Sequence, residues 1–402
     1  MALLAVETAL ARMLDGVEPT NSESVDLLAA AGRVLACDLA AHLTQPPFDA
    51  SAMDGYAVRA ADVATLPTTL RLIGEAAAGH AFSGSVGAGE AVRIFTGAPV
   101  PAGADAIVIQ ENVAAEGTII QVVEGKPDAE HLRRRGGDFR EGEAPLKAGR
   151  RLTARDVTLA AAMGHATVPV RRRPGVAILA TGDELVPPGE TPRADQIISS
   201  NPYGLAAIVA AAGGKPRLLG IARDTRESLA EKIAAADGAD VLLTIGGASV
   251  GAHDLVVPAL EAAGMTLDFW KIAMRPGKPM IFGRRGASQR IVGLPGNPVS
   301  SLICTRVFVV PLIARLLGDA APASAPRAAL LAAPLEANGP RTHFMRGNFV
   351  AGEGGAPRVA AARSQDSSLL TPLAAADCLI VRPADAPPAA VGDTVAVLDL
   401  DF

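Results

Sequence analysis

The order of apolar and polar residues divides the chain into stretches with different periodicity. Residues 1–14 place apolar side chains at helical spacing with charged residues between them, which predicts an amphipathic helix. Residues 24–32 predict a second helix that ends at Gly32, and residues 33–41 predict a strand. We therefore expect a mixed helical and extended region over residues 1–45.

The pattern changes between residues 46 and 137. Short alternating or β-branched runs are separated by Gly and Pro turns there, and no long helical pattern occurs. The runs lie at residues 70–74, 90–95, 105–113 and 118–123. Residues 46–137 are therefore predicted to form a small inserted β domain.

Helical periodicity returns between residues 138 and 172. Thr153 is a predicted N-cap and Gly164 a predicted helix end, because a hydroxyl can bond the first free N–H groups and glycine can adopt a left-handed conformation. We expect residues 138–172 to join residues 1–45 in one linking domain, with the N-terminal helix packing on the domain that follows.

Strand and helix patterns alternate from residue 173 to 318. Strands are expected at 176–181, 216–222, 240–245, 266–273 and 291–294, and helices at 226–237 and 253–264. Two further helices are expected to begin at the Asn–Pro pairs 201–202 and 297–298, since proline suits the first helical turn. Such alternation predicts a mostly parallel sheet with helices on both faces.

The remaining residues, 319–402, begin with a Pro- and Ala-rich stretch and continue as short strands. This pattern indicates a linker over 319–329 followed by a small C-terminal β domain of barrel type. The predicted fold class is therefore α/β and multidomain. It combines a mostly parallel α/β domain with the inserted β domain, the linking domain and the C-terminal barrel-like domain.

Composition narrows the function classes. The chain has 402 residues, of which 49% are apolar, and a formal net charge of −5, so it can bury several cores and is not suited to non-specific nucleic-acid binding. We expect a small-molecule partner. The cysteines Cys37, Cys304 and Cys378 are too far apart in sequence for a disulfide framework or a thiolate zinc site, and the six histidines show no ligand spacing.

The apolar run at 301–318 does not predict a membrane span. Arg306, Pro311 and Arg315 interrupt it. The N-terminus lacks the basic region of a signal peptide. We therefore expect no membrane association and a cytoplasmic, reducing location.

Charged residues follow four of the predicted strands of the α/β region. In an open α/β sheet a ligand normally binds outside the carboxyl ends of the strands. Any single acidic loop residue also suits an ordinary polar surface loop. Together, carboxylates and cations beside glycine-rich turns favour a nucleotide or pyrophosphate held with Mg²⁺. The residues are Asp183 and Glu184, Arg223 and Asp224, Asp254 in TIGGASVGAHD (244–254), and Arg275 and Lys278 in MRPGKP (274–279).

Other segments fit more than one interpretation when each is taken by itself. The glycine loop at 244–254 suits either a phosphate cradle or a tight turn. The Pro-Gly turns in MRPGKP and in GLPGNPVS (293–300) are stiff enough to fix an anion but also suit simple turns. The pair Asp54-Gly55 is a strong turn signal without an evident ligand.

Taken in order, eight segments resemble the molybdopterin molybdenumtransferase family of the bacterial MoeA type, which is similar to the E domain of gephyrin. The resemblance covers essentially the whole chain, because the flanking residues also fit. The segments are FDASAMDGYAVR (48–59), RIFTGAPVPAGADAIV (93–108), RRRGGD (133–138), ATGDEL (180–185), GIARD (220–224), TIGGASVGAHD (244–254), WKIAMRPGKP (270–279) and GLPGNPVS (293–300).

The resemblance implies a transferase of molybdenum cofactor biosynthesis. Such an enzyme inserts molybdate, its co-substrate, into adenylylated molybdopterin, cleaves the phosphoanhydride with the help of Mg²⁺ and releases AMP. It further implies a homodimer whose active site lies between the α/β domain of one subunit and the inserted β domain of the other. A molybdopterin adenylyltransferase that supplies the substrate is an implied partner.

The family's functional positions can be matched residue by residue. The catalytic matches are Asp54, Thr96, Asp138, Glu184, Asp224 and Asp254, and the resemblance implies that Asp224 and Asp254 bind Mg²⁺. The substrate- and anion-binding matches are Gly246, Gly247, Ser249, Gly251, Lys271, Arg275, Lys278, Pro295, Pro298, Ser300, Arg346 and Ser367, the last two for molybdate. Three positions depart from the family pattern: Arg275 replaces a common lysine, Ala248 replaces a usual valine, and Ser199-Ser200-Asn201 lacks an acidic residue.

Two other functions are compatible with parts of the chain. Residues 174–318 resemble a molybdopterin adenylyltransferase, but those enzymes typically carry GGTG where this chain has GGASVG, and the chain has three further domains. A gephyrin-like dimeric scaffold is the alternative from another class. The charged loops argue against a purely structural role.

Overall fold

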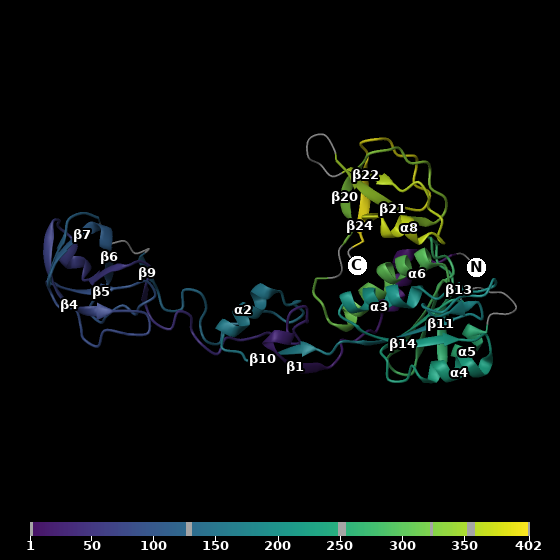
Figure 1. Ribbon diagram of the computed structural model, residues 1–402, viewed down its shortest axis with the longest axis horizontal. Helices are drawn as coiled ribbons and strands as arrows, with labels where there is room; N and C mark the ends of the chain where they lie inside the picture. The colour runs from purple at the N-terminus through teal and green to yellow at the C-terminus, as the bar shows by residue number, and fades with distance from the viewer. Residues whose placement is uncertain (1–2, 126–130, 248–254, 322–324, 352–357, 401–402) are drawn as a thin grey trace.

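The computed structural model describes residues 3–125, 131–247, 255–321, 325–351 and 358–400. The molecule is elongated (Figure 1). The inserted β domain lies at one end, a small linking region lies in the middle, and the α/β domain and a β-barrel lie together at the other end. The predicted multidomain α/β fold class is confirmed.

The α/β domain contains a six-stranded sheet in the order β14-β11-β15-β19-β18-β16. The first four strands in this order are parallel, and β18 and β16 are antiparallel to their neighbours. The strands are β11 (Gly175–Thr181), β14 (Lys215–Ala222), β15 (Val241–Ile245), β16 (Met265–Phe269), β18 (Ile281–Arg285) and β19 (Gln289–Leu294). Strand β18 was not predicted, because its apolar run is only three residues long before two arginines interrupt it.

Helices cover both faces of this sheet. Alternate residues of β11 point to opposite faces, so Val176 and Ile178 pack with one set of helices while Ala177 and Leu179 pack with the other. The first set is α1 (Val6–Leu14), α3 (Asn201–Ala211), α6 (Pro298–Cys304) and α7 (Val310–Leu316), with the π-helical turn η5 (Thr305–Val309) between the last two; the second is α4 (Arg226–Ala234) and α5 (Val256–Ala262).

One continuous helical run in the described residues, Pro298–Leu316, is long and apolar enough to cross a membrane. However, 78% of its apolar window is buried inside the structure, with Ile303, Phe308 and Leu312 in the core of the α/β domain. The run therefore has the packing of a core helix.

The linking region differs from its prediction at residues 24–32. The expected helix there is wrong: Ser22–Asp26 form β1, which pairs antiparallel with β10 (Thr167–Arg171), and only the short 3-10 helix η1 (Leu27–Ala29) follows. The partner strand lies about 140 residues away, so local periodicity could not reveal the pairing. Residues 33–41 make isolated bridges and not a continuous strand.

Helix α2 (Ala154–Ala162) begins where the sequence predicted. Asp156 accepts hydrogen bonds from the Thr153 N–H and from the Thr153 hydroxyl, both at 2.8 Å, as in a capping box. Gly164 has a φ of +91°, which only glycine adopts readily. The N-cap and the helix end are therefore confirmed.

The inserted domain is a six-stranded sheet in the order β6-β3-β5-β4-β8-β7. Its strands are β3 (Gly55–Val58), β4 (Thr68–Ala76), β5 (Glu90–Ile94), β6 (Ala106–Ile109), β7 (Val113–Glu116) and β8 (Ile119–Val122), with 3-10 helices η2 (Ala60–Val63) and η3 (Gln110–Asn112). A short ladder of β2 (Ala50–Ser51) and β9 (Leu132–Arg133) closes its base. Two chain segments, or arms, connect it to the linking region, and they pair at Gln45 and Phe139.

The C-terminal region is a closed five-stranded barrel, because β21 pairs with both β22 and β23. Its elements are β20 (Arg327–Leu331), β21 (Thr342–Val350), β22 (Arg358–Ala361), α8 (Leu370–Ala374), β23 (Cys378–Arg382) and β24 (Thr394–Asp399). Strand β17 (Met274–Arg275) of the α/β domain adds to β21 in parallel. The barrel is therefore hydrogen-bonded to a loop of the α/β domain.

Candidate functional site

A cavity of about 710 Å³ lies at the carboxyl ends of the parallel strands. The loops after β11, β14, β15 and β19 all contribute to its wall, as the strand order places them side by side. Six of the predicted site residues line it: Glu184, Asp224, Gly246, Gly247, Pro295 and Pro298. The predicted Ser249, Gly251 and Asp254 belong to the same glycine loop but lie outside the described residues.

The two Asn–Pro pairs also meet at this cavity. Asn201 and Pro202 begin α3, Asn297 and Pro298 begin α6, and all four residues line the wall. The Asn201 side chain donates a hydrogen bond to the carbonyl of Gly296 at 2.7 Å, which ties the two helix starts together. Helix N-termini favour anions, so this wall suits phosphate oxygens. The Asn–Pro pairs predict the two helix starts, and the resemblance further implies substrate binding at Pro298, but neither predicts that the two pairs lie together.

The glycine loop approaches the neighbouring strand too closely for a side chain. Gly246 has a φ of +94°, and a Cβ added there would lie 2.7 Å from the backbone carbonyl oxygen of Thr181. Gly247 follows with a φ of +59°. These glycines therefore allow the backbone of two adjacent strand ends to form one continuous surface facing the cavity.

Two carboxylates, Asp224 and Glu184, line the same cavity. The neighbouring Asp183 accepts a hydrogen bond from the Asp224 N–H at 3.3 Å and so helps fix the turn after β14. Within the described residues no group of three or more His, Cys, Asp or Glu side chains is arranged to hold a metal. One or two carboxylates plus substrate phosphates are nevertheless a usual Mg²⁺ environment, so this donor set fits that ion.

The predicted cations lie on a stiff loop next to the cavity. Arg275 and Lys278 are exposed on MRPGKP, and Pro279 at its end lines the cavity wall. The Ile272 N–H donates to the Lys278 carbonyl oxygen at 3.1 Å and closes the loop. The amino group of Lys271 lies 4.1 Å from the centre of the Trp270 ring, a cation–π contact that orients it.

A loop of the barrel reaches the start of α6. The Asn297 side chain donates to the Ser367 hydroxyl at 3.0 Å, and the Val299 N–H donates to the Ser367 carbonyl oxygen at 3.1 Å. The adjacent Ser368 and Leu370 line the cavity. Ser367 therefore lies beside the site although it belongs to another domain.

The structure places Arg346 and Ser300 beneath this surface. Arg346 is 1% exposed, and its guanidinium donates at 3.0 Å to the carbonyl oxygens of Ser364, Asp366 and Leu369, on both sides of Ser367. Ser300 is 4% exposed in the first turn of α6. Arg346 holds the loop that carries Ser367, and in this conformation its donors are directed at the backbone.

Positive charge accumulates where β17 meets β21. His343, which is opposite Arg275 in the ladder, is 7% exposed. Burial, together with the charges of Arg275, Arg341 and Arg346, lowers the pKa of His343 to about 4. Burial is the main reason that His343 stays neutral, and the three arginines around it add positive charge that would attract an oxyanion.

Three predicted residues lie far from this cavity in the same chain. In the inserted domain, the Thr96 N–H and hydroxyl both donate to Asp54 Oδ1 at 2.8 Å, and these bonds lower the pKa of the Asp54 carboxyl. Asp138 is exposed on one arm, where its N–H donates to the Gln45 carbonyl oxygen. The linking region separates these residues from the α/β domain (Figure 1), so one chain does not bring them to the cavity.

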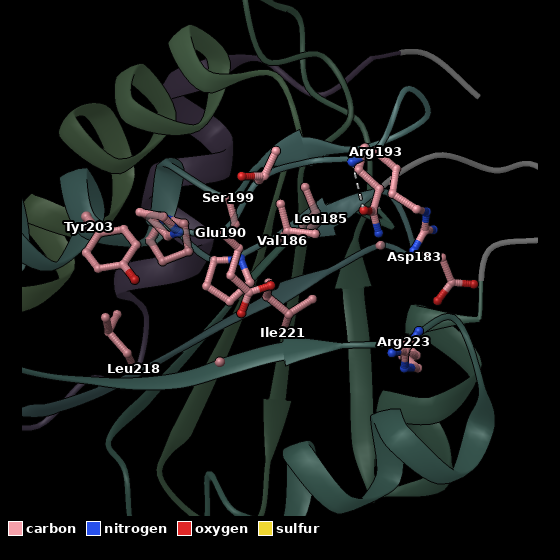
Figure 2. A pocket seen from close by; sticks show the side chains of 17 residues that line it. Asp183, Leu185, Val186, Glu190, Arg193, Ser199, Tyr203, Leu218, Ile221 and Arg223 are labelled. Atoms are coloured by element: carbon pink, nitrogen blue, oxygen red, sulfur yellow. Dashed lines mark hydrogen bonds between the residues drawn. The ribbon is translucent and has the colours of Figure 1, made fainter.

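Figure 2 shows a second cavity, of about 700 Å³, on the outer side of residues 182–199. Asp183, Arg193 and Arg223 lie toward one end of it, and Tyr203 and Leu218 lie toward the other. Asp183 and Arg223, two of the charged loop residues noted in the sequence, line it, but none of the residues matched to the family's functional positions does. The matched positions of the α/β domain that line a cavity therefore line the first one.

Family models match three parts of the chain, which together include the inserted domain, the α/β domain and the barrel. Residues 4–164 match the MoeA N-terminal region (domain I and II), residues 177–315 match a probable molybdopterin binding domain, and residues 328–400 match the MoeA C-terminal region (domain IV).

Similar proteins and structures span most or all of the chain. The chain is 36% identical over 400 residues to the molybdopterin molybdenumtransferase of Haemophilus influenzae, covering 98% of both chains. It is 38% identical over 305 residues to that of a Nostoc species, covering 74% of this chain and 70% of the relative. The crystal structure of a molybdopterin biosynthesis MoeA protein from Pyrococcus horikoshii superposes with a TM-score of 0.84 at 31% identity, over 100% of both chains. The chain therefore belongs to the molybdopterin molybdenumtransferase family.

Proposed function

We propose that this enzyme inserts molybdate into adenylylated molybdopterin and releases AMP in a Mg²⁺-dependent reaction of molybdenum cofactor biosynthesis. One observation carries the proposal: the cavity at the carboxyl ends of the parallel strands combines carboxylates, glycine-loop backbone and two helix starts with a loop of the barrel. A ligand that suits all of these groups has phosphate oxygens, a bound divalent cation and a second anionic portion.

The phosphoanhydride would bind at the helix starts and at Gly246 and Gly247. Asp224 and Glu184 would hold Mg²⁺ there, together with Asp254 as the family resemblance implies. The ion would withdraw charge from the phosphate oxygens during cleavage. The contribution of the chain is to fix these donors, which the hydrogen bond from the Asp224 N–H to Asp183 supports.

Molybdate would bind at the junction of the α/β domain and the barrel. Lys271, Arg275 and Lys278 supply positive charge on a stiff loop, and Ser367 supplies a hydroxyl beside α6. The charges of Arg275, Arg341 and Arg346 around His343 support an electropositive junction. We assign Arg346 to the positioning of the Ser367 loop, because its guanidinium is buried and bonded to that loop.

The homodimer is also part of the proposal. Asp54, Thr96 and Asp138 lie on the inserted domain and its arm, far from the cavity of their own chain (Figure 1). A second copy could bring these residues to the cavity, as the family resemblance implies. The proposal includes three further points. The domains comprise residues 1–45 with 138–172, residues 46–137, residues 173–318 and residues 319–402. The enzyme is cytoplasmic, and a molybdopterin adenylyltransferase supplies its substrate.

The reaction itself is the first test. Purified protein with adenylylated molybdopterin, molybdate and Mg²⁺ is expected to release AMP, and Asp224→Asn should reduce kcat by about 100-fold while the protein stays folded. Asp195→Asn is the matched control, because Asp195 is an exposed carboxylate in the same domain that lines neither cavity. Full activity of Asp224→Asn would reject the metal assignment, and no AMP from wild type would reject the function.

The shared site needs a separate experiment. An Asp54→Ala subunit mixed with an Asp224→Ala subunit should form one intact site per heterodimer and recover part of the activity. Each variant assayed alone should remain inactive. A heterodimer without activity would reject the assignment of Asp54 to the partner's cavity.

A further inference from the structure

Arg93 is held between two aromatic rings beside the turn that carries Asp54. It lies on β5 directly opposite Tyr56 of β3. Its guanidinium carbon is 4.9 Å from the centre of the Tyr56 ring and 5.0 Å from that of Phe95. Stacking on two rings restricts the rotation of the side chain, so the direction of its donors is fixed.

The donors of Arg93 hold both sides of the turn. Nη1 donates to the Gly55 carbonyl oxygen at 3.3 Å, and Nη2 donates to Gln110 Oε1 at 2.5 Å. The Gln110 N–H in turn donates to the Asp54 carbonyl oxygen at 3.1 Å. The carbonyl groups of Asp54 and Gly55 are therefore tied to a single guanidinium, that of Gly55 directly and that of Asp54 through Gln110.

Packing at Gly55 leaves the turn little freedom. A Cβ at Gly55 would lie 2.0 Å from the Val108 carbonyl oxygen, so β6 contacts this backbone closely. Because the turn cannot move toward β6, loosening the Arg93 side would displace it in the other direction. Such a displacement would move the Asp54 carboxylate with it.

The Asp54 carboxylate has one occupied and one free oxygen. Oδ1 accepts both hydrogen bonds from Thr96, whereas Oδ2 accepts none from the described residues. The charge of Arg93 adds to the Thr96 bonds in lowering the pKa of this carboxyl. The carboxylate of Glu111, the residue after Gln110, accepts a hydrogen bond from the Gln110 side chain at 3.3 Å.

We propose that Arg93 is a positioning residue of the active site, which fixes the Asp54-Gly55 turn so that Asp54 Oδ2 faces the ligand in the partner's cavity. This inference rests on the proposed function, because it takes Asp54 as part of the shared site. Arg93 begins the matching segment RIFTGAPVPAGADAIV (93–108), but the resemblance assigns it no functional position. Arg93 acts through Asp54 and does not touch the substrate.

Two substitutions at Arg93 distinguish the effect of its positive charge from the effect of its hydrogen-bond geometry. Arg93→Met keeps the length but removes the charge and the donors, and Arg93→Lys keeps the charge but loses the two-point contact. Arg71→Met is the matched control, because Arg71 lies on β4 of the same sheet and pairs with Glu90 at the surface. Circular dichroism checks that each full-length variant is folded.

The readouts are AMP release and the titration of the Asp54 carboxyl, observed by carbon-13 NMR of aspartate-labelled protein and assigned with Asp54→Asn. Arg93→Met should lower kcat by about 10- to 100-fold and move the titration midpoint to higher pH. Arg93→Lys should return the midpoint toward wild type but recover only part of kcat. Arg71→Met should change neither.

The outcomes distinguish the inference from the function on which it rests. If wild type releases AMP and Arg93→Met matches Arg71→Met in kcat, Arg93 has no positioning role. If wild type releases no AMP, the proposed function fails, and the titration decides alone: an unmoved midpoint in Arg93→Met overturns the inference about the turn.

Discussion

A methyl group added at Gly277 would test how the cation loop is held. Gly277 has a φ of +106°, and a Cβ there would lie 2.4 Å from the sulfur of Cys304. Cys304 is fully buried in α6, so its sulfur has little space to move. The left-handed backbone costs about 1–3 kcal/mol for alanine and the overpacking about 1–3 kcal/mol, so Gly277→Ala should destabilise the domain by roughly 2–6 kcal/mol.

The sequence provides a direct assay. Trp270 is the only tryptophan and lies seven residues before Gly277, so its fluorescence during urea unfolding reports on this domain. Gly286→Ala is the control, since Gly286 has a φ of +59° but nothing within 4 Å of the added Cβ. The control should cost only about 1–2 kcal/mol.

A double substitution isolates the steric contact. Cys304→Ala removes the sulfur, so combining it with Gly277→Ala should recover the overpacking part, about 1–3 kcal/mol, and leave the backbone part. If Gly277→Ala costs no more than Gly286→Ala, or if the double variant shows no recovery, the loop is not held by contact with the buried helix.

Three further outcomes are expected. The pKa of His343 is lowered in the folded state, so its contribution to the free energy of unfolding is fully present above the unfolded pKa of about 6.5. This contribution, up to about 3 kcal/mol, is lost as the pH falls toward 4. His343→Gln should flatten this pH dependence in urea unfolding measured between about pH 7.5 and 4.5. Ser367→Ala removes the hydroxyl bonded to Asn297 and should raise the KM for molybdate several-fold with under about 1 kcal/mol change in stability, whereas an unchanged KM would exclude it from the site. Asp240→Asn weakens the two bonds from Arg172 and should cost about 1–3 kcal/mol in the same unfolding assay; no loss would show the pair to be dispensable.

The sequence was sufficient to predict the position of a strand where the strand is long and its own pattern of apolar residues shows that it is buried. The strands at 176–181 and 240–245 are almost wholly apolar and were placed within one residue of β11 and β15. Because parallel strands end at the same edge, the order of strands and loops also located the cavity that Glu184 and Asp224 line.

Features that depend on distant pairing were not predictable in this way. Residues 24–32 have helical periodicity, but pairing with β10 determines the structure of residues 24–26. The contact of Ser367 with Asn297 depends on how the barrel sits against α6, and the stacking of Arg93 on Tyr56 depends on the register of β3 and β5. None of these contacts can be predicted from the residues on either side of it in the sequence.

The pairing of β17 with β21 has a mechanical consequence. It adds a strand from the α/β domain to the barrel, and the Ser367 contact ties the same two domains a second time, so they should tumble as a single rigid body. Among the described residues, the inserted domain is joined to the rest of its chain through two arms that pair at Gln45 and Phe139 (Figure 1). We therefore expect a free subunit to bend mainly at these two arms, so that a small rotation there would move the far end of the inserted domain over a large distance. Pairs of fluorescent labels in the free subunit should report one fixed separation between barrel and α/β domain and a broad range of separations to the inserted domain, which the proposed homodimer would narrow.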